Sequence, residues 1–480
     1  MAEKMLQFTK VSRSMPAKRP ATARADDFRE IYADFSHEAA KAQAGRCLQC
    51  GVPFCQQGCP LQNNIPDWLK LAAEDRLEEA WRVSSATNNM PEICGRICPQ
   101  DRLCEGICTI EQSGHGTVTI GSIEKHITDT AWAEGWIQPI RPPRERAQSV
   151  GIIGAGPGGL AAAEQLRRKG YQVTVYDAYD RGGGLLVYGI PGFKLEKEVV
   201  ERRIVHLETS GIRFRFNTRV GKDVSLGDLR AEHNSVLIAT GVYAAKDLRC
   251  PGSGAEGVFA ALDYLTASNR MGLGDTVEAF ESGDLNAEGK RVVVIGGGDT
   301  AMDCVRTAIR QGAKSVTCLY RRDRANMPGS QREVLNAEEE GAVFEWLATP
   351  EAILDSKNGK VKAVRASKMK LGEPDASGRQ TPLKSGETLD VKADMVIKAL
   401  GFDPEDLPRL FNEPALTVNR WGAVRVDYAT MQTSLAGVYA AGDIVRGASL
   451  VVWAIKDGRD AAEAMHKAMK ATASDKVAAE

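Results

Sequence analysis

The stretch "SVGIIGAGPGGLAAAEQLRRKGYQVTVYDA", residues 149–178, constrains the fold more than any other part of the chain. A short apolar strand over residues 149–153 enters Gly154-x-Gly156-x-x-Gly159, a helix follows, and a second strand ends at Asp177. In such a unit the first glycine makes a tight turn, the second lets a pyrophosphate approach the backbone, and the third allows close helix–strand packing. The stretch therefore predicts a parallel α/β fold that binds a dinucleotide.

The phosphates of this dinucleotide would meet the free N–H groups and the positive dipole at the start of the helix. Asp177 stands twenty-three residues after Gly154, where a carboxylate can accept hydrogen bonds from the ribose hydroxyls. The predicted first binding set is Gly154, Ala155, Gly156, Pro157, Gly158, Gly159 and Asp177.

A second unit of the same kind begins at Lys290, with the strand "RVVVI" followed by Gly296-x-Gly298-x-x-Ala301. Its next strand ends in "YRRDR" and not in an acid. An acid there would accept the ribose 2′-OH of NAD, whereas arginines suit the 2′-phosphate of NADP. The predicted NADPH set is Gly296, Gly297, Gly298, Asp299, Thr300, Ala301, Arg321 and Arg322, with Arg324 as a further candidate.

Length and charge limit the class of protein. A chain of 480 residues is long enough for two to four domains. The net charge of −1, from 62 basic and 63 acidic residues, gives no global field toward nucleic acid or a membrane surface. No apolar run approaches the ~18 residues of a transmembrane helix, and the first residues lack an apolar secretory core. We expect a cytoplasmic protein without nucleic-acid or membrane partners.

Composition divides the chain into three parts. A basic arm opens it, helical text follows, and the Pro- and Arg-rich stretch 137–148 is the clearest linker. After the linker, strands and glycine turns alternate with helices, as in a parallel α/β sheet. The predicted limits are 1–145 for a helical iron–sulfur domain with its arm, 146–252 and 402–480 for an FAD-binding domain, and 253–401 for an NADPH-binding domain.

Within the helical part, residues 65–83 ("IPDWLKLAAEDRLEEAWRV") predict a helix that begins after Asn64. Asn64 can cap this helix and Pro66 falls in its first turn. The apolar residues at helical spacing, which predict one buried face, are Ile65, Trp68, Leu69 and Ala72.

Eight of the eleven cysteines lie in two runs, "CLQCGVPFCQQGCP" and "CGRICPQDRLCEGIC". In a reducing compartment such a density indicates metal or redox chemistry and not structural disulfides. Both runs contain Cys-Pro, as bacterial ferredoxins do, and eight thiolates match two [4Fe–4S] clusters. Zinc is the rival, although only the first pair has the C-x₂-C form of a zinc knuckle. The candidate ligands are Cys47, Cys50, Cys55, Cys59, Cys94, Cys98, Cys104 and Cys108.

The motifs "ATG" (239–241), "KALGF" (398–402) and "GVYAAGD" (437–443) resemble the strand ends of two-dinucleotide flavoprotein reductases. The loop "GGGLLVYGIPGFKL" (182–195) resembles the flavin-contacting loop of the glutamate synthase small-subunit family. Relatives of that family are the electron-input half of dihydropyrimidine dehydrogenase and the large subunit of NADPH–ferredoxin transhydrogenases. The resemblance covers roughly residues 28–465 with the motifs in order.

The resemblance implies a multidomain protein, in which the helical iron–sulfur domain precedes two Rossmann-like domains of glutathione-reductase type. The NADPH domain would be inserted in the FAD domain. The helix after "AGDIVRGASLVV" would aim its positive N-terminal dipole at the flavin. The resemblance adds to the FAD set Gly183, Gly184, Leu185, Thr240, Gly241, Gly442 and Asp443.

For the metal ligands, the resemblance implies that Cys108 completes a first cluster held by the first three cysteines of the chain. Cys59, Cys98 and Cys104 would hold the second cluster. Its last ligand is either Cys94 or Glu124, and the softness of the thiolate favours Cys94.

Two facing dinucleotides predict direct hydride transfer from NADPH to FAD, which requires alignment but no catalytic side chain. No redox cysteine pair lies in the flavin-loop motifs, so electrons would leave through the two [4Fe–4S] clusters. The implied partner is a glutamate synthase large (alpha) subunit that forms L-glutamate from L-glutamine and 2-oxoglutarate, in a hetero-oligomer. The alternatives are the NADPH-oxidising subunit of a ferredoxin transhydrogenase or pyrimidine reductase, and a non-enzyme redox-sensing flavoprotein scaffold. The basic arm is either a docking element or a disordered leader.

Overall fold

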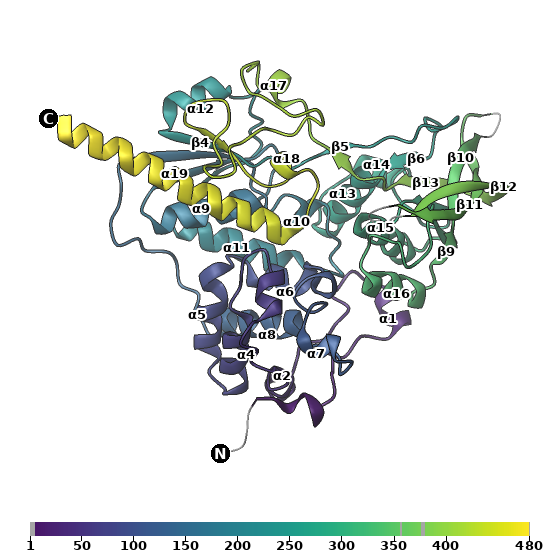
Figure 1. The fold of residues 1–480 in the computed structure, drawn as a ribbon. Helices are drawn as coiled ribbons and strands as arrows, with labels where there is room; N and C mark the ends of the chain where they lie inside the picture. The colour runs from purple at the N-terminus through teal and green to yellow at the C-terminus, as the bar shows by residue number, and fades with distance from the viewer. Residues whose placement is uncertain (1–4, 356–357, 376–379, 480) are drawn as a thin grey trace.

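A computed structural model of the chain describes residues 5–355, 358–375 and 380–479. A helical N-terminal part lies beneath two α/β parts that stand side by side (Figure 1). The helices of the N-terminal part are α2 (His37–Ala44), α3 (Phe54–Gly58), α4 (Ile65–Ala73), α5 (Leu77–Thr87), α6 (Pro91–Ile97), η2 (Gln100–Arg102), α7 (Thr109–Gln112) and α8 (Ile120–Ala133).

The first α/β part is built on a parallel sheet with the strand order β15-β4-β1-β2-β3. Its strands are β1 (Ser149–Ile153), β2 (Gln172–Tyr176), β3 (Arg213–Arg215), β4 (Ser235–Ile238) and β15 (Val438–Ala440). Its helices include α9 (Pro157–Arg168), α10 (Leu185–Tyr188), α11 (Lys197–Thr209), α12 (Leu226–Glu232), α18 (Asp443–Arg446) and α19 (Val451–Ala479).

Helices α9 and α19 cross at glycines. A Cβ on Gly458 would lie 2.1 Å from the carbonyl oxygen of Gly158, so only glycine allows this approach. The crossing brings the first turn of α19 next to the loop that precedes α9. Although α19 is long, no helix in the described part of the chain combines the length and apolar character needed to cross a bilayer.

The second α/β part is inserted between β4 and β15, as predicted. Its parallel sheet has the order β6-β13-β7-β8-β9, and an antiparallel β10-β11-β12 sheet follows β9. The strands are β6 (Val258–Ala260), β7 (Arg291–Ile295), β8 (Ser315–Tyr320), β9 (Val343–Trp346), β10 (Ala348–Asp355), β11 (Val361–Pro374), β12 (Gln380–Lys392) and β13 (Met395–Lys398). The main helices are α13 (Ala261–Gly272), α15 (Asp299–Arg310) and α16 (Gln331–Glu339).

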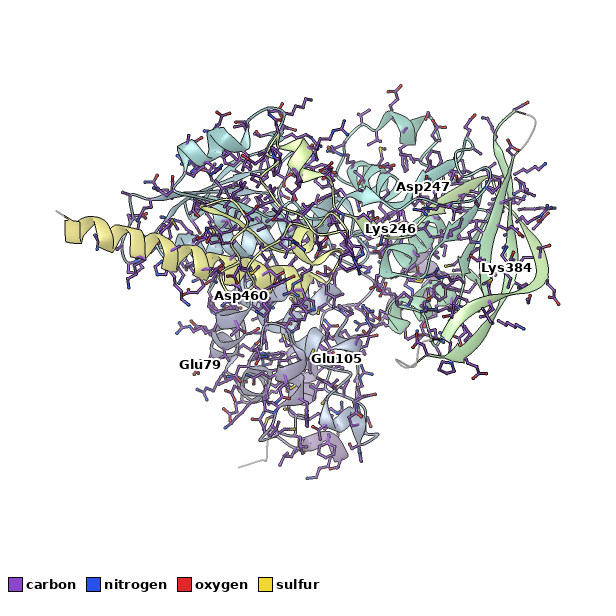
Figure 2. All side chains as sticks on the ribbon, turned by 45° about the horizontal axis from the view of Figure 1, so that its top comes forward. Glu79, Glu105, Lys246, Asp247, Lys384 and Asp460 are labelled. Carbon is purple, nitrogen blue, oxygen red and sulfur yellow. The ribbon has the colours of Figure 1, made fainter. Side chains whose placement is uncertain are left out.

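The two chain segments that connect these parts pair with each other. Strands β5 (Ala244–Ala245) and β14 (Phe402–Asp403) form a short antiparallel ribbon. Lys246 and Asp247, labelled in Figure 2, follow β5, and Asp247 forms an ion pair with Lys398 at 2.6 Å. This double connection confirms the predicted insertion, while the exact domain limits stay predictions.

The helix predicted over residues 65–83 is two helices. α4 ends at Ala73 and α5 begins at Leu77, because Asp75 has a left-handed φ of 71° that no helix can continue. Pro66 lies in the first turn of α4 and its predicted apolar face is buried. Asn64 occupies the predicted N-cap position, but its side chain donates to Asp67 at 2.6 Å and accepts no hydrogen bond from the helix backbone.

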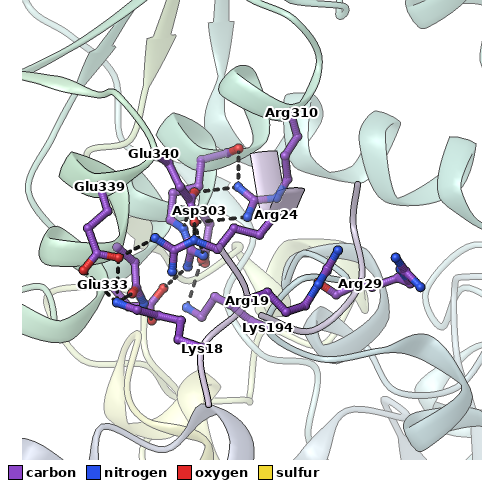
Figure 3. A network of polar contacts seen from close by, with 12 residues as sticks. Lys18, Arg19, Arg24, Arg29, Lys194, Asp303, Arg310, Glu333, Glu339 and Glu340 are labelled. Carbon is purple, nitrogen blue, oxygen red and sulfur yellow. Dashed lines mark hydrogen bonds and ion pairs between the residues drawn. The ribbon is translucent and has the colours of Figure 1, made fainter. Parts of the chain in front are cut away.

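The described part of the basic arm is neither extended throughout nor free. It contains the short helices η1 (Gln7–Thr9) and α1 (Ala21–Ala25), and Arg24 is fully buried against α16 of the same chain. The Arg24 guanidinium pairs with Glu339 and with Glu340, and Lys18 pairs with Glu339 at 2.6 Å (Figure 3). The arm therefore fastens the N-terminal part to the inserted part, which contradicts a disordered leader.

Glu340 provides a test of this fastening. Its carboxylate neutralises Arg306 at 2.8 Å, Arg310 at 2.7 Å and Arg24 at 3.3 Å, and all of these side chains are buried. Glu340→Gln leaves the buried Arg310 without an ion-pair partner, while Arg306 keeps Glu333 and Arg24 keeps Glu339, and we expect the free energy of unfolding to fall by about 3–5 kcal/mol. The half-exposed Glu339 is the matched control, with an expected loss below about 1 kcal/mol for Glu339→Gln. Urea denaturation midpoints measure both, and equal midpoints would contradict the expectation.

Candidate functional site

The first glycine loop has the geometry that only glycine permits. Gly154 has a φ of 107°, and a Cβ there would lie 2.4 Å from the carbonyl oxygen of Ala239. A Cβ on Gly159 would lie 2.0 Å from the carbonyl oxygen of Gly154. Gly156, in contrast, faces open space, with no described atom within 4 Å of where its Cβ would stand. This cradle fits the pyrophosphate of a dinucleotide.

The second glycine loop repeats the arrangement. Gly296 has a φ of 148°, and its Cβ would lie 2.2 Å from the carbonyl oxygen of Ala399, which follows β13 as Ala239 follows β4. Gly298 faces open space among the described residues, and Ala301 is fully buried in the third place. Alanine therefore fits in the position of the third glycine without a steric clash.

A cleft between the two α/β parts collects most of the predicted FAD residues. The first turn of α19 lines it through Val451 and Ala454, as predicted for a helix aimed at the flavin. The predicted residues in its wall are Gly154, Gly156, Pro157, Gly158, Asp177, Leu185, Thr240, Gly241, Gly442, Asp443, Asp299 and Thr300.

The other predicted residues do not line the cleft. Gly183 donates its backbone N–H to the carbonyl of Ala155 at 2.8 Å, so the triple-glycine loop packs behind the first glycine loop. The predicted residues outside the wall are Ala155, Gly159, Gly183, Gly184, Gly296, Gly297, Gly298, Ala301, Arg321 and Arg322.

Asp177 has a structural role that the sequence did not predict. Its carboxylate accepts the backbone N–H groups of Ala155 at 2.6 Å and of Tyr179 at 2.8 Å. These bonds hold the glycine loop against the end of β2. The side chain also lines the cleft, where the predicted contact with a ribose stays a prediction.

The three arginines after β8 differ in exposure and in their polar partners. Arg321 is exposed and Arg322 is half-buried, with an Nε atom that has no hydrogen-bond partner in the described structure. Arg324 pairs with Glu338 of α16 at 2.9 Å. The geometry therefore leaves Arg321 and Arg322 as the better candidates for a phosphate group.

Four of the eight clustered cysteines surround one small cavity in the helical part. They are Cys47, Cys50, Cys55 and Cys108, the set implied by the family pattern. Burial raises the pKa of Cys47 to about 11, and the charges of Cys108 and Cys50 raise it further. Burial likewise raises the pKa of Cys55 to about 12, with Cys47 and Cys108 acting in the same direction. Buried thiols that raise one another's pKa can be deprotonated together only with a cation among them.

The remaining four cysteines form a second group, nearer the cleft. Burial raises the pKa of Cys98, and Cys59 acts in the same direction. The pKa of Cys94 is raised by burial and by Cys98, and that of Cys104 by burial, by Glu105, by Cys98 and by Cys59. Cys98 and the following proline form part of the cleft wall. The second group therefore borders the cleft, whereas the first group surrounds a separate cavity.

The spacing of the thiols helps to distinguish zinc from iron–sulfur clusters. A zinc ion holds four thiolates at about 2.3 Å from one point. Within residues 5–355, 358–375 and 380–479, no three His, Cys, Asp or Glu side chains converge closely enough to hold one metal ion. A cluster places each thiolate on a separate iron and so spreads the sulfur atoms apart. The donor set fits iron–sulfur clusters better than zinc.

Glu124, the rival of Cys94, is buried beside the second group. Its Oε1 accepts hydrogen bonds from Asn88 at 3.2 Å, Ser84 at 3.3 Å and Asn63 at 3.4 Å. Burial raises the pKa of Glu124 to about 8, although these donors lower it in part. Cys94 also has a hydrogen-bond partner, Asn88, so the choice between Cys94 and Glu124 as the last ligand stays a prediction.

Several cleft residues were not predicted from the sequence. Lys194, in the flavin-loop motif, pairs with Asp303 of α15 at 2.9 Å and so joins the two α/β parts. Arg332 and Glu333, at the start of α16, line the same cleft. Asp303 follows Asp299 by one helical turn, so both lie on the same face of α15. The helical periodicity of the second glycine unit could therefore have predicted Asp303 as a cleft residue. No local sequence pattern marks Arg332 or Glu333 as a cleft residue.

Cysteines outside the two groups provide no electron exit at the flavin. All eleven cysteines are free, and Cys304 and Cys318 are fully buried. The Cys318 thiol donates to the carbonyl of Gly296 at 3.3 Å. The described structure therefore contains no cysteine pair poised for disulfide chemistry.

Two facing dinucleotide folds, with two groups of four thiols beside their cleft, define an oxidoreductase that combines a pyridine nucleotide, a flavin and iron–sulfur clusters. Residues 24–136 match the family "Dihydropyrimidine dehydrogenase domain II, 4Fe-4S cluster". Residues 148–458 match the family "Pyridine nucleotide-disulphide oxidoreductase". The fold is similar to that of FprA from Mycobacterium tuberculosis in complex with NADPH, with a TM-score of 0.58, 20% identity, and coverage of 69% of this chain and 86% of that one.

The chain is 65% identical over 477 residues to the glutamate synthase [NADPH] small chain of Azospirillum brasilense, covering 99% of this chain and 98% of that one. It is 47% identical over 470 residues to the Escherichia coli protein of the same name, with coverage of 96% and 98%. The chain belongs to the glutamate synthase small-chain family, as its motifs predicted. It is an NADPH-dependent oxidoreductase with FAD and iron–sulfur clusters as cofactors.

The choice between Cys94 and Glu124 can be tested by substitution. We expect Cys94→Ala to lose one of the two clusters, because a soft thiolate ligand of the second cluster is removed. We expect Glu124→Gln, the matched control, to keep both, because an amide can retain the hydrogen bonds of the carboxyl group. Iron content and paramagnetic resonance after dithionite reduction measure both variants. Two intact clusters in Cys94→Ala would remove Cys94 from the ligand set.

The open space at Gly156 gives a second test. We expect Gly156→Ala to weaken FAD binding by about tenfold or more, because the added methyl group occupies the path of the pyrophosphate. Gly254→Ala is the control, since this glycine also faces open space but lies outside the cleft. Flavin content per chain and fluorescence titration with FAD measure the effect. Equal FAD affinity in the two variants would contradict the placement.

Proposed function

We propose that this chain is the electron-entry subunit of an NADPH-dependent glutamate synthase, located in the cytoplasm and assembled with a large subunit. The carrying observation is that Cys98 of the second thiol group forms part of the wall of the dinucleotide cleft. The first glycine loop lines this cleft, as do Asp299 and Thr300 directly after the second glycine loop, so nucleotide, flavin and second cluster would be neighbours. The relatives are called small chains, which supports a large partner.

When bound, NADPH supplies a hydride to FAD, and the clusters accept electrons one at a time. The chain's own residues provide binding and alignment. The glycine loops bind the pyrophosphates, and the first turn of α19 presents its backbone N–H groups to the cleft. Lys194 and Asp303 hold the two α/β parts together at its edge. We assign no residue to proton transfer, since hydride transfer between cofactors requires none.

The thiol groups would form a path away from the cleft. Cys94 and Cys98 pack in the core of the first α/β part, whereas Cys47 and Cys108 pack in the core of the helical part. Beside the first group, exposed apolar side chains are Val52, Phe54 and Ile107. This arrangement supports electron exit toward a partner at the first group. The large subunit would use the electrons to form L-glutamate from L-glutamine and 2-oxoglutarate.

Anaerobic mixing with NADPH and, separately, with NADH tests the entry half of this proposal. We expect rapid bleaching of the flavin by NADPH. Failure of NADPH to reduce the flavin would support a sensing scaffold. Affinity purification of the tagged chain from its own cells tests the exit half. Recovery of a larger flavin- and iron-containing amidotransferase supports the proposal, whereas a small ferredoxin-reductase partner would overturn it in favour of a transhydrogenase.

Arg321 and Arg322 give a test of nucleotide selectivity. We expect Arg321→Ala and Arg322→Ala each to raise the KM for NADPH by about tenfold or more, because a charge-assisted hydrogen bond to the 2′-phosphate is lost. The KM for NADH, which lacks this phosphate, should not change. Arg324→Ala is the matched control, because Glu338 already holds Arg324. Equal rates with NADH and NADPH in the unmodified protein would contradict the assignment.

A further inference from the structure

The short helix η2 lies between Cys98 and Cys104 of the second thiol group, and each of its three residues contacts the inserted α/β part. Gln100 accepts a hydrogen bond from Arg332 at 3.0 Å, and Asp101 accepts one from Ser330 at 3.1 Å. Arg102 donates to the carbonyl of Pro328. The loop that carries second-cluster ligands is therefore docked on the NADPH-binding half.

Gln100 organises this loop from within. Its buried side chain donates to the carbonyl of Cys94 at 2.7 Å. The backbone carbonyl of Gln100 accepts hydrogen bonds from the backbone N–H groups of Leu103, Glu105 and Gly106, at 3.0, 2.9 and 3.2 Å. Gln100 thus connects the backbone before Cys98 with the backbone around Cys104. The Gln100 side chain therefore links Arg332, through two hydrogen bonds, to the backbone carbonyl of Cys94, a candidate cluster ligand.

Arg332 forms no ion-pair contact in the described structure, and its guanidinium donates a hydrogen bond to the neutral amide of Gln100. Burial acts to lower the pKa of Arg332, but the nearby groups Glu105, Tyr32, Glu333 and Asp101 raise it. Arg332 lines the dinucleotide cleft together with Cys98. In the described structure, Arg332 is thus a cation in the same cleft wall as Cys98, with carboxylates near it but none in ion-pair contact.

We propose that Arg332, supplied by the NADPH-binding half, raises the reduction potential of the cluster held by Cys59, Cys94, Cys98 and Cys104. Reduction adds one negative charge to a cluster, and a nearby cation stabilises the reduced state. Arg332 is a positioning and tuning residue that contacts the ligand loop without ligating metal. This inference rests on the proposed ligand set, and it adds that one half of the protein sets the potential of a cofactor held by another.

The test is a redox titration of the purified holoprotein, monitored by paramagnetic resonance, for the unmodified chain, Arg332→Gln and Arg332→Lys. In Arg332→Gln we expect the reduced-to-oxidised ratio of the second cluster at fixed potential to fall about tenfold, which is 59 mV for one electron. Arg332→Lys keeps the charge and should keep the potential. The first cluster, completed by Cys108, is the internal reference and should not shift.

An unchanged second-cluster potential in Arg332→Gln, or an equal shift of both clusters, would overturn the proposal. If Arg332→Gln loses iron, Arg332→His replaces it, because its charge can be switched in one folded protein. Its second-cluster potential should then fall as the pH rises, relative to that of the unmodified chain, and a parallel pH dependence would overturn the proposal. Flavin reduction by NADPH is measured on the same samples. Its absence in the unmodified chain would refute the proposed function, whereas an unshifted potential with normal flavin reduction refutes only the role of Arg332.

Discussion

Buried ion pairs across the boundaries between the three parts of the chain determine how those parts are oriented. Lys194 joins the two α/β parts through Asp303 at 2.9 Å, and Arg203 of α11 joins Glu92 of α6 through two hydrogen bonds of 2.8 and 2.9 Å. Arg24 adds the arm to the inserted part. A buried charge without its partner costs several kcal/mol, so these contacts penalise every other orientation of the parts. Apolar packing alone would tolerate sliding.

This fixed orientation gives the cleft its composition. A two-dinucleotide fold on its own would bring flavin and nucleotide residues together and leave the electrons with no exit except a cysteine pair. Here the helical part is held against both α/β parts, and it contributes Cys98 and Pro99 to the cleft wall. The two-dinucleotide fold therefore serves a protein without redox disulfides, because the helical part supplies the route for electrons that a cysteine pair would otherwise supply.

The predictions from sequence succeeded where local backbone geometry decides the structure. Strands β1 and β7 were predicted to the residue, because each ends in a glycine turn that only one backbone conformation allows. The break between α4 and α5 was missed because a left-handed Asp75 leaves the apolar spacing on both sides intact. Arg332 and the docking of the arm were missed for another reason. Their partners lie more than two hundred residues away, and no local pattern marks a long-range ion pair or hydrogen bond.

The split of the first cysteine run follows from the same geometry. Helix α3 contains Cys55 and ends at Gly58, so that Cys59, its C-cap residue, follows Cys55 by about 6 Å along the helix axis. Cys55 lines the cavity of the first group, whereas Cys59 acts on the thiols of the second. The backbone hydrogen bonds of this one helical turn therefore fix how far apart Cys55 and Cys59 lie. The other members of the second group are placed by different contacts, since Cys94 and Cys98 pack in the core of the first α/β part, so the two groups are joined directly through α3 and indirectly through the packing of the helical part against that core.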